Sequence, residues 1–164
     1  MTFHVRSAND DDVDAISILL SSVYDDRHPA ILARDLRAGR HFHREIVAER
    51  DGVVLGYVAL VTLAAPPNWV ALSLLSVSHS VQDQGVGRQL VVAAQDEARF
   101  SKRDAIVAVG GEDYLRRCRF APKAAANLRT EFPPNIVSLY PVKPETALSH
   151  AVIKFPEPFS RSSS

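Results

Sequence analysis

The sequence has 164 residues, of which 46% are hydrophobic, so it has the size of one domain with a sizeable core. Its 19 Lys and Arg residues equal its 19 Asp and Glu residues, which gives no reason to expect nucleic acid or an anionic membrane as partner. A single cysteine, Cys118, excludes an internal disulfide and a cysteine-based zinc site, and we expect it to serve in packing.

The N-terminal part of the chain is expected to form a strand and two helices. Residues 3–6 alternate apolar and polar side chains as a strand does. A helix capped by Asn9 or Asp10 follows, with acidic residues at its positive end, and a second helix runs from Pro29 to Gly39. The aspartates at 10–12 could hold a metal, but capping explains them more simply, and we expect no metal site.

The start of the chain has no basic segment followed by a long apolar core, so we expect no secretory signal. The longest apolar run, residues 53–65, is shorter than the roughly 20 residues that a membrane-spanning helix needs. We therefore expect a soluble, cytoplasmic protein without a membrane partner.

Three strands in antiparallel succession are predicted next. Residues 46–48 and 53–63 read as strands joined by the tight turn Arg50-Asp51-Gly52, a strong hairpin signal. A second turn at residues 65–68 leads through Trp69 into a buried strand that ends near Val77. The apolar spacing then changes to that of a helix, which begins near Val86.

The turn between this strand and this helix is a candidate phosphate cradle. The start of a helix leaves backbone N–H groups without partners and carries positive potential, so it attracts anions. Gly85 and Gly87 let a ligand approach the backbone closely, and Arg88 adds a charged donor. A dinucleotide fingerprint would need glycine or alanine where Leu90 stands, and a P-loop would need Lys followed by Ser or Thr after the last glycine. Both of these readings fail.

After the helix, residues 104–109 form a continuous apolar run that is typical of a strand covered on both faces. A strand–helix–strand crossover of this length places the second strand parallel to and beside the first. We expect the two strands to splay apart and leave a cleft at the helix start. The predicted fold is thus α/β (α+β), a mixed twisted sheet of about six or seven strands with helices on both faces.

Seven of the ten prolines lie after position 120. We therefore expect residues 123–164 to form short strands and loops on the same domain as the core, residues 1–122, rather than a second core. The prediction is a single domain over residues 1–164.

The pattern Gln82-x-x-Gly85-x-Gly87 between a strand and a helix resembles the coenzyme A pyrophosphate loop of the GNAT superfamily of N-acetyltransferases. The segment 110–122 is similar to the Gly-Asp-x-x-Tyr-Tyr-x-Arg-Phe-Gly-Phe-x-Pro segment of the YhbS-like branch of bacterial predicted N-acetyltransferases. The tail, residues 136–159, resembles the end of that branch. The resemblance covers nearly the whole chain and implies the GNAT acyl-CoA N-acyltransferase fold.

The resemblance also implies a coenzyme site and a reaction. An acetyl group would move from acetyl-CoA to a primary amine by direct attack in a ternary complex, without a metal. Backbone groups of three strand residues would pair with the pantetheine arm, and seven loop amides would hold the pyrophosphate. The implied strand residues are Leu75, Ser76 and Val77, and the implied loop residues are Gln82, Asp83, Gln84, Gly85, Val86, Gly87 and Arg88.

The sequence departs from the superfamily pattern where the chemistry is concentrated. The usual acid is a tyrosine five residues before the Phe that closes the helix, and this position is Leu115. Tyr114 matches the first tyrosine of the branch's pair and is the candidate acid and coenzyme contact, although its spacing favours Leu115 in the acid's place. Arg119 replaces the usual glycine. No base is identifiable, because the acids at positions 45, 49 and 112 are each expected to be solvated surface residues.

Two functions remain open. The first is an active acetyltransferase for a small amine or for a protein N-terminus or lysine. The second is a coenzyme A binding sensor or partner domain with little catalysis, which Leu115 favours modestly. We place the enzyme first because thiolate is a fair leaving group even without an acid. The acceptor would be read by loops at residues 29–42 and 122–134, which carry no motif, and a homodimer is left open.

Overall fold

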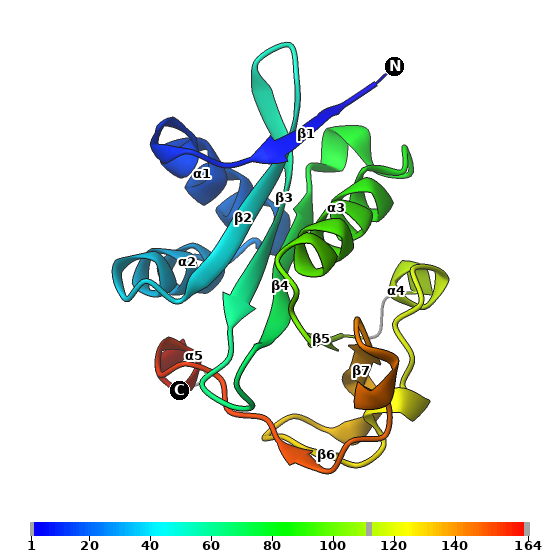
Figure 1. Ribbon diagram of the computed structural model, residues 1–164. Coiled ribbons are helices and arrows are strands. Elements are labelled where there is room, and N and C mark those ends of the chain that lie inside the picture. The colour runs from blue at the N-terminus through cyan, green and yellow to red at the C-terminus, as the bar shows by residue number, and fades with distance from the viewer. Residues whose placement is uncertain (1, 111–112, 163–164) are drawn as a thin grey trace.

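The computed structural model describes residues 2–110 and 113–162, with only the backbone of residues 113, 114, 161 and 162 (Figure 1). The strands are β1 (His4–Ser7), β2 (Phe42–Arg50), β3 (Val53–Thr62), β4 (Trp69–Val77), β5 (Ala105–Val109), β6 (Leu128–Arg129), β7 (Val137–Tyr140) and β8 (Ala151–Val152). The helices are α1 (Val13–Tyr24), α2 (His28–Ala38), α3 (Val86–Phe100), α4 (Asp113–Arg117) and α5 (Pro158–Ser162).

Six strands form one mixed sheet in the order β1-β2-β3-β4-β5-β7. The pair β4–β5 is parallel and the other neighbouring pairs in this sheet are antiparallel. The predicted mixed sheet and the predicted parallel pair are both confirmed. The hairpin turn between β2 and β3 is also where the sequence places it, with Asp51 and Gly52 at φ of 54° and 77°.

Helices cover both faces of the sheet, as predicted: α1 and α2 lie on one face and α3 on the other (Figure 1). Side chains along β3 alternate between the two cores, because successive residues of a strand point to opposite faces. Tyr57, Ala59 and Val61 are buried with α1 and α2, whereas Val58 and Leu60 are buried beneath α3. The sheet is therefore apolar on both sides in its centre.

The aspartates before α1 act as a cap and an ion pair. Asn9 accepts a hydrogen bond from the Asp11 N–H at 2.9 Å, and the Asn9 N–H donates to Asp12 Oδ2 at 2.8 Å, which together form a capping box. Arg6 donates to Asp12 Oδ2 at 2.7 Å, and its guanidinium lowers the pKa of that carboxyl. The Asp12 carboxylate, one of the three that carried the metal alternative, is thus held by Arg6 and by the Asn9 N–H.

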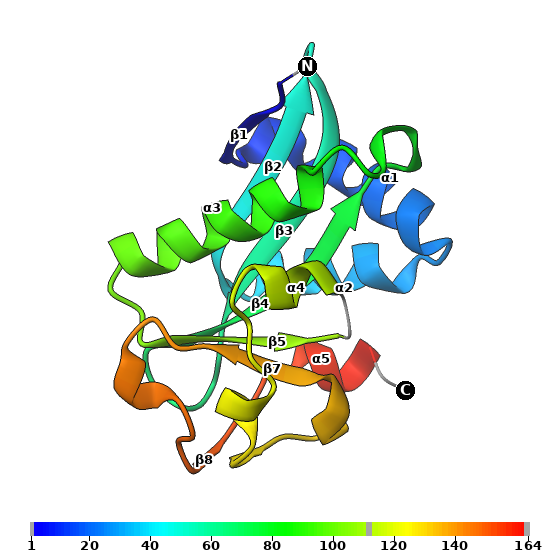
Figure 2. The same cartoon turned by 90° about the vertical axis from the view of Figure 1, so that its right-hand side faces the viewer.

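The tail extends the sheet and then folds back across its end. Strand β7 pairs with β5, and β6 pairs with β8 in a separate parallel ladder. Lys154 bridges to Ala65 in the turn before β4, and Ile153 is buried in the same core as α1 and α2. The short helix α5 was not predicted, and it brings the C-terminal residues close to the open end of the β4–β5 pair (Figure 2).

Gly56 sets the distance between α3 and the sheet. A Cβ at this position would lie 2.9 Å from Leu90 Cδ1 and 2.9 Å from Val86 Cγ1. Both contacts are closer than packed carbon atoms allow, so only glycine lets the first turns of α3 rest on β3 at this distance. The start of α3 is therefore held by direct packing against the sheet.

We expect Gly56→Val to destabilise the fold by roughly 1–3 kcal/mol, because the added methyl groups overpack this contact. Urea denaturation followed by circular dichroism measures the loss. Val53→Ile, at an exposed position of the same strand, is the control and should change stability by less than about 0.5 kcal/mol. An unchanged midpoint in Gly56→Val would show that α3 can move away freely.

Candidate functional site: a strand end, a loop and a helix start

The loop between β4 and α3 has the geometry of an anion cradle. After a 3₁₀ turn at His79–Val81 the backbone of Gln82 is extended, and Asp83 and Gly85 adopt left-handed conformations with φ of 63° and 80°. The Gln89 N–H donates to the Gly85 carbonyl at 3.1 Å and is the first hydrogen bond of the helical ladder. The N–H groups of residues 86–88 therefore stand before that ladder, at the positive end of α3.

The loop is open at Gly85. No atom lies within 4 Å of the place that a Cβ of Gly85 would occupy, so a ligand has room to reach the backbone there. The Gln82 side chain donates to the Val77 carbonyl at 2.9 Å and ties the loop to the end of β4. The residues fit a bound pyrophosphate, since donors, space and a fixed backbone occur together.

Strands β4 and β5 diverge as predicted. Their pairing runs from Trp69 with Ala105 to Leu72 with Ala108, yet β4 continues to Val77 (Figure 2). Within the described ranges, residues 73–77 have no strand beside them on the β5 side. This edge can accept an extended ligand as an additional strand would be accepted.

A bulge in β4 marks the same place. Tyr57 faces Ser76 and Ala59 faces Ser73, so β4 carries one extra residue between these pairs. Leu74 takes up the irregularity with φ of 58°, a left-handed conformation that is unusual for a leucine. Strained positions of this kind gather at binding and active sites. The bulge was not predicted from the sequence.

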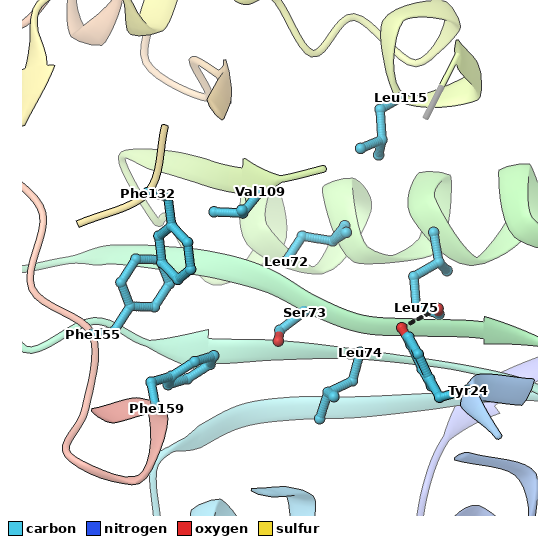
Figure 3. Close-up of a pocket in the computed structure, with 10 residues that line it drawn as sticks. All are labelled: Tyr24, Leu72, Ser73, Leu74, Leu75, Val109, Leu115, Phe132, Phe155 and Phe159. Atoms are coloured by element: carbon cyan, nitrogen blue, oxygen red, sulfur yellow. Dashed lines mark hydrogen bonds between the residues drawn. The ribbon is translucent and has the colours of Figure 1, made fainter. Parts of the chain in front are cut away.

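A cavity of about 250 Å³ opens at the divergence (Figure 3). Leu72, Ser73, Leu74 and Leu75 of β4 form its floor, and Val109 and Leu115 approach from β5 and α4. Its remaining walls come from Tyr24, Phe132, Phe155 and Phe159. The Tyr24 hydroxyl donates to the Leu75 carbonyl at 3.0 Å, which links the end of α1 to the bulge (Figure 3).

Helix α4 ends in a Schellman motif that orients Leu115. The Phe120 N–H donates to the Leu115 carbonyl at 3.0 Å, and the Arg119 N–H donates to the Arg116 carbonyl at 3.0 Å. Arg119 has φ of 72°, so it adopts the left-handed conformation of the glycine that it replaces. Leu115 is 5% exposed and lines the cavity. Leu115 thus faces the site where the superfamily's usual acid is expected to act.

We expect Arg119→Gly to stabilise the protein by roughly 0.5–1 kcal/mol, because glycine relieves the left-handed strain at φ of 72°. The opposite result is expected for Arg116→Gly, which places glycine within α4 and should lower the free energy of unfolding by roughly 0.5–1 kcal/mol. Thermal unfolding of both variants measures the two changes in stability. A loss of stability in Arg119→Gly would mean that the arginine side chain contributes more than its backbone strain costs.

The structure separates the predicted coenzyme residues into groups. Leu75 lines the cavity, and Ser76 is 2% exposed with its hydroxyl donating to the Leu74 carbonyl at 3.0 Å. Most loop residues, from Gln82 to Gly85 and Arg88, are exposed, whereas Val86 is buried against β3 and Gly87 lies half-buried between them. The backbone of Tyr114 belongs to α4, but its side chain lies outside the described part of the chain.

The expectation that Glu45 and Glu49 are solvated surface residues is wrong. Glu45 accepts hydrogen bonds from the Tyr57 hydroxyl at 2.7 Å and from Arg37 at 2.6 Å, and Arg6 donates to Glu49 at 3.0 Å. Each carboxylate is held by an arginine, so neither is free to serve as a base. Glu112, the third candidate, lies outside the described residues.

Other candidate chemistries find no support in the geometry. Burial raises the pKa of the Cys118 thiol, which keeps it protonated and unreactive, in line with packing. Among the described residues no cluster of three His, Cys, Asp or Glu side chains could hold a metal. In the same part of the chain no helix combines the length and the apolar character needed to span a membrane.

Sequence reasoning included Phe132 in the loop at residues 122–134 that is expected to read the acceptor, but it missed the other residues that close the cavity away from β4. Tyr24, Phe132, Phe155 and Phe159 come from the end of α1 and from two separate parts of the tail. No spacing or motif joins them in the sequence. The resemblance of the tail to the YhbS-like branch indicated that the tail belongs to the same domain, but it did not indicate that Phe155 and Phe159 line the cavity.

A mixed sheet in which splayed parallel strands flank a glycine-bearing helix start is the fold of the GNAT N-acetyltransferases. The chain matches the model of the Acetyltransferase (GNAT) family over residues 13–123. It is 30% identical over 126 residues to the uncharacterized N-acetyltransferase YhbS of Escherichia coli K12, covering 74% of this chain and 75% of that protein. This chain therefore belongs to the GNAT acetyltransferase family.

Solved structures agree with this assignment. The E. coli YhbS structure in complex with CoA superposes with a TM-score of 0.91 at 25% identity, covering 97% of this chain and 92% of that chain. A GNAT family acetyltransferase from Brucella melitensis in complex with acetyl-CoA gives a TM-score of 0.81 at 22% identity, covering 96% of this chain and 98% of that chain. The second likeness shows the shared fold. The predicted resemblance to the YhbS-like branch is thus confirmed.

Proposed function

We propose that this protein, acting as a single domain, transfers the acetyl group of acetyl-CoA to a primary amine by direct attack in a ternary complex. The proposal rests on one observation: an unpaired strand edge and a set of backbone N–H groups at a helix start lie next to each other. The unpaired edge of β4 at residues 73–77 leads directly into the N–H groups of residues 86–88 at the start of α3.

Each half of this surface suits one part of acetyl-CoA. The pyrophosphate would bind the amides from Gln82 to Arg88, where the α3 dipole favours negative charge. The pantetheine arm would lie along the edge of β4 near Leu75, Ser76 and Val77, as an added strand does. The bound co-substrate would supply an activated acetyl thioester at the cavity. The structures of YhbS with CoA and of the Brucella protein with acetyl-CoA support acetyl-CoA as the co-substrate.

The reaction balances without a covalent enzyme intermediate. The amine nitrogen bonds to the acetyl carbonyl carbon, the carbon–sulfur bond breaks, and the nitrogen gives up one proton to water. The coenzyme leaves as a thiolate that is later protonated by solvent, because the described cavity presents Leu115 rather than an acid there. The protein's contribution is then mainly the positioning of amine and thioester.

A second function, a coenzyme A binding sensor or partner domain, has one specific observation in its favour. Leu115 is buried and lines the cavity, and the family resemblance aligns it with the usual acid, which would assist the leaving thiolate. A domain that binds the coenzyme without turning it over would keep the loop and the β4 edge but would not need the donor. Measurement of turnover separates this function from the first.

Two measurements on the purified protein test the proposal. Acetyl-CoA at about 100 times its dissociation constant should add about 2.7 kcal/mol to the free energy of unfolding and so raise the melting temperature. Release of free thiol from acetyl-CoA, measured against a panel of primary amines, should show turnover with at least one of them. A thermal shift without turnover would favour the sensor, and the absence of both would contradict the proposed function.

A further inference from the structure

The far wall of the cavity is built from aromatic side chains. Phe132 and Phe155 meet edge to face with ring centroids 5.2 Å apart, and Phe155 and Phe159 follow with centroids 5.0 Å apart. In Figure 3 these three rings gather at one end of the cavity, and Leu75, Tyr24 and Leu115 lie toward the other. The aromatic end therefore offers apolar ring surfaces to a ligand.

The two ends of the cavity have different places in the reaction. The end at Leu75 adjoins the β4 edge, along which the proposed function places the pantetheine arm and its thioester. The aromatic end lies across the cavity from it, which leaves that end for the acceptor once the thioester occupies the other. Phe132, Phe155 and Phe159 are therefore the side chains that would surround whatever group the attacking amine carries.

None of the ten lining residues whose side chains the structure describes carries a charge. A polyamine or another acceptor with several positive charges would place ammonium groups beside side chains that offer no carboxylate partner, which costs free energy. An amine with an apolar substituent has no such cost. The apolar surroundings also disfavour the ammonium form of the reacting group, which increases the neutral fraction that can attack.

The size of the cavity suits a small apolar group on the acceptor. An apolar cavity of about 150 Å³ is enough to hold benzene. The cavity here is about 250 Å³, which leaves room for one ring with a short alkyl arm beside the acetyl group. A drug-sized ligand typically needs about 300–1,000 Å³.

From these observations, and resting on the proposed function, we propose that the acceptor is a small primary amine whose nitrogen is attached through a short arm to an aromatic ring or an apolar group of similar size. The ring packs against Phe132, Phe155 and Phe159. The amine nitrogen then points toward Leu75 and the thioester.

The first test compares acceptors at saturating acetyl-CoA by thiol release. 2-Phenylethylamine and ethylamine present the same primary amine with and without the ring, and spermidine presents the same group with additional charges. We expect kcat/KM for 2-phenylethylamine to exceed that for ethylamine by about 10–100-fold, as burial of a group of this size predicts. We expect spermidine to fall below both.

The second test changes the wall. Phe155→Ala should raise KM for 2-phenylethylamine by about tenfold while leaving the acetyl-CoA thermal shift intact, because Phe155 contacts both other rings. Phe155→Leu keeps most of the apolar volume and serves if the alanine variant is unstable. Phe100→Leu is the control, since Phe100 is 87% exposed on α3 and should leave KM unchanged. Ser73→Asp, which adds a carboxylate to the floor, should shift the preference toward spermidine.

The outcomes separate this inference from the proposed function. A thermal shift together with preferred turnover of spermidine, or equal turnover of ethylamine and 2-phenylethylamine, would overturn the inference and leave the acetyltransferase standing. A thermal shift with no turnover of any amine would overturn the inference and favour the sensor. Absence of both the shift and turnover would overturn the proposed function and the inference with it.

Discussion

Replacing Gly85 with glutamate is expected to abolish the rise in melting temperature that acetyl-CoA causes. The substitution puts a side chain into the open space above the loop and a negative charge beside the amides proposed to hold the pyrophosphate. Differential scanning fluorimetry with and without acetyl-CoA measures the shift. The same result is expected for Gly87→Glu, two residues further along and within the first turn of α3.

Gly52 provides a matched control for this experiment. It has φ of 77° against 80° for Gly85, and no atom lies within 4 Å of either Cβ position. Glutamate at either glycine should therefore cost similar backbone strain, roughly 1–2 kcal/mol. Gly52→Glu, which sits in the turn between β2 and β3, should lower the melting temperature but preserve the shift. A full shift in both Gly85→Glu and Gly87→Glu would show that the loop is not the binding site.

A large increase in turnover is expected when a tyrosine replaces Leu115, the residue at the position of the superfamily's usual acid. Leu115→Tyr should raise kcat at least about tenfold, because a general acid typically contributes about 10²–10⁴-fold and Leu115 faces the cavity. Leu115→Phe is the matched control, since it adds the ring without the hydroxyl, and it should give no such increase. Initial rates with a working acceptor measure both. The comparison isolates the hydroxyl from any change in packing.

Tyr114→Phe tests the competing assignment. If Leu115 stands in the acid's place, loss of the Tyr114 hydroxyl should lower turnover by less than about threefold. The regular Schellman ending of α4 supports this expectation, because Arg119 adopts the left-handed conformation without shifting the helix by a residue. A loss of about 10²-fold or more with coenzyme binding intact would instead make Tyr114 the acid.

The order of elements was predictable because local patterns determine it. Apolar alternation predicts a strand, the Asp51-Gly52 turn predicts a hairpin, and the change of spacing at Val86 predicts the start of a helix. The crossover rule then makes β4 and β5 parallel. The shape of the loop between β4 and α3 was predictable for a related reason, since it depends on the contiguous residues from Gln82 to Arg88. Its predicted contacts with acetyl-CoA remain predictions until binding is measured.

The bulge in β4 and the aromatic wall of the cavity were not predictable, because their residues meet only in three dimensions. Leu74 looks like any leucine in an apolar strand, yet its φ of 58° creates the bulge. Phe132, Phe155 and Phe159 read as isolated aromatics among prolines, and Tyr24 as the end of an amphipathic helix. Glu45 looked solvated because its arginine partner, Arg37, lies on a different element.

The two ends of the cavity come from different stretches of the chain, which affects how the protein can diverge. The proposed coenzyme contacts lie within residues 75–88, whereas the aromatic wall lies within residues 132–159. On the proposed roles, substitutions in the tail can change which acceptor is used without altering any residue of the loop before α3.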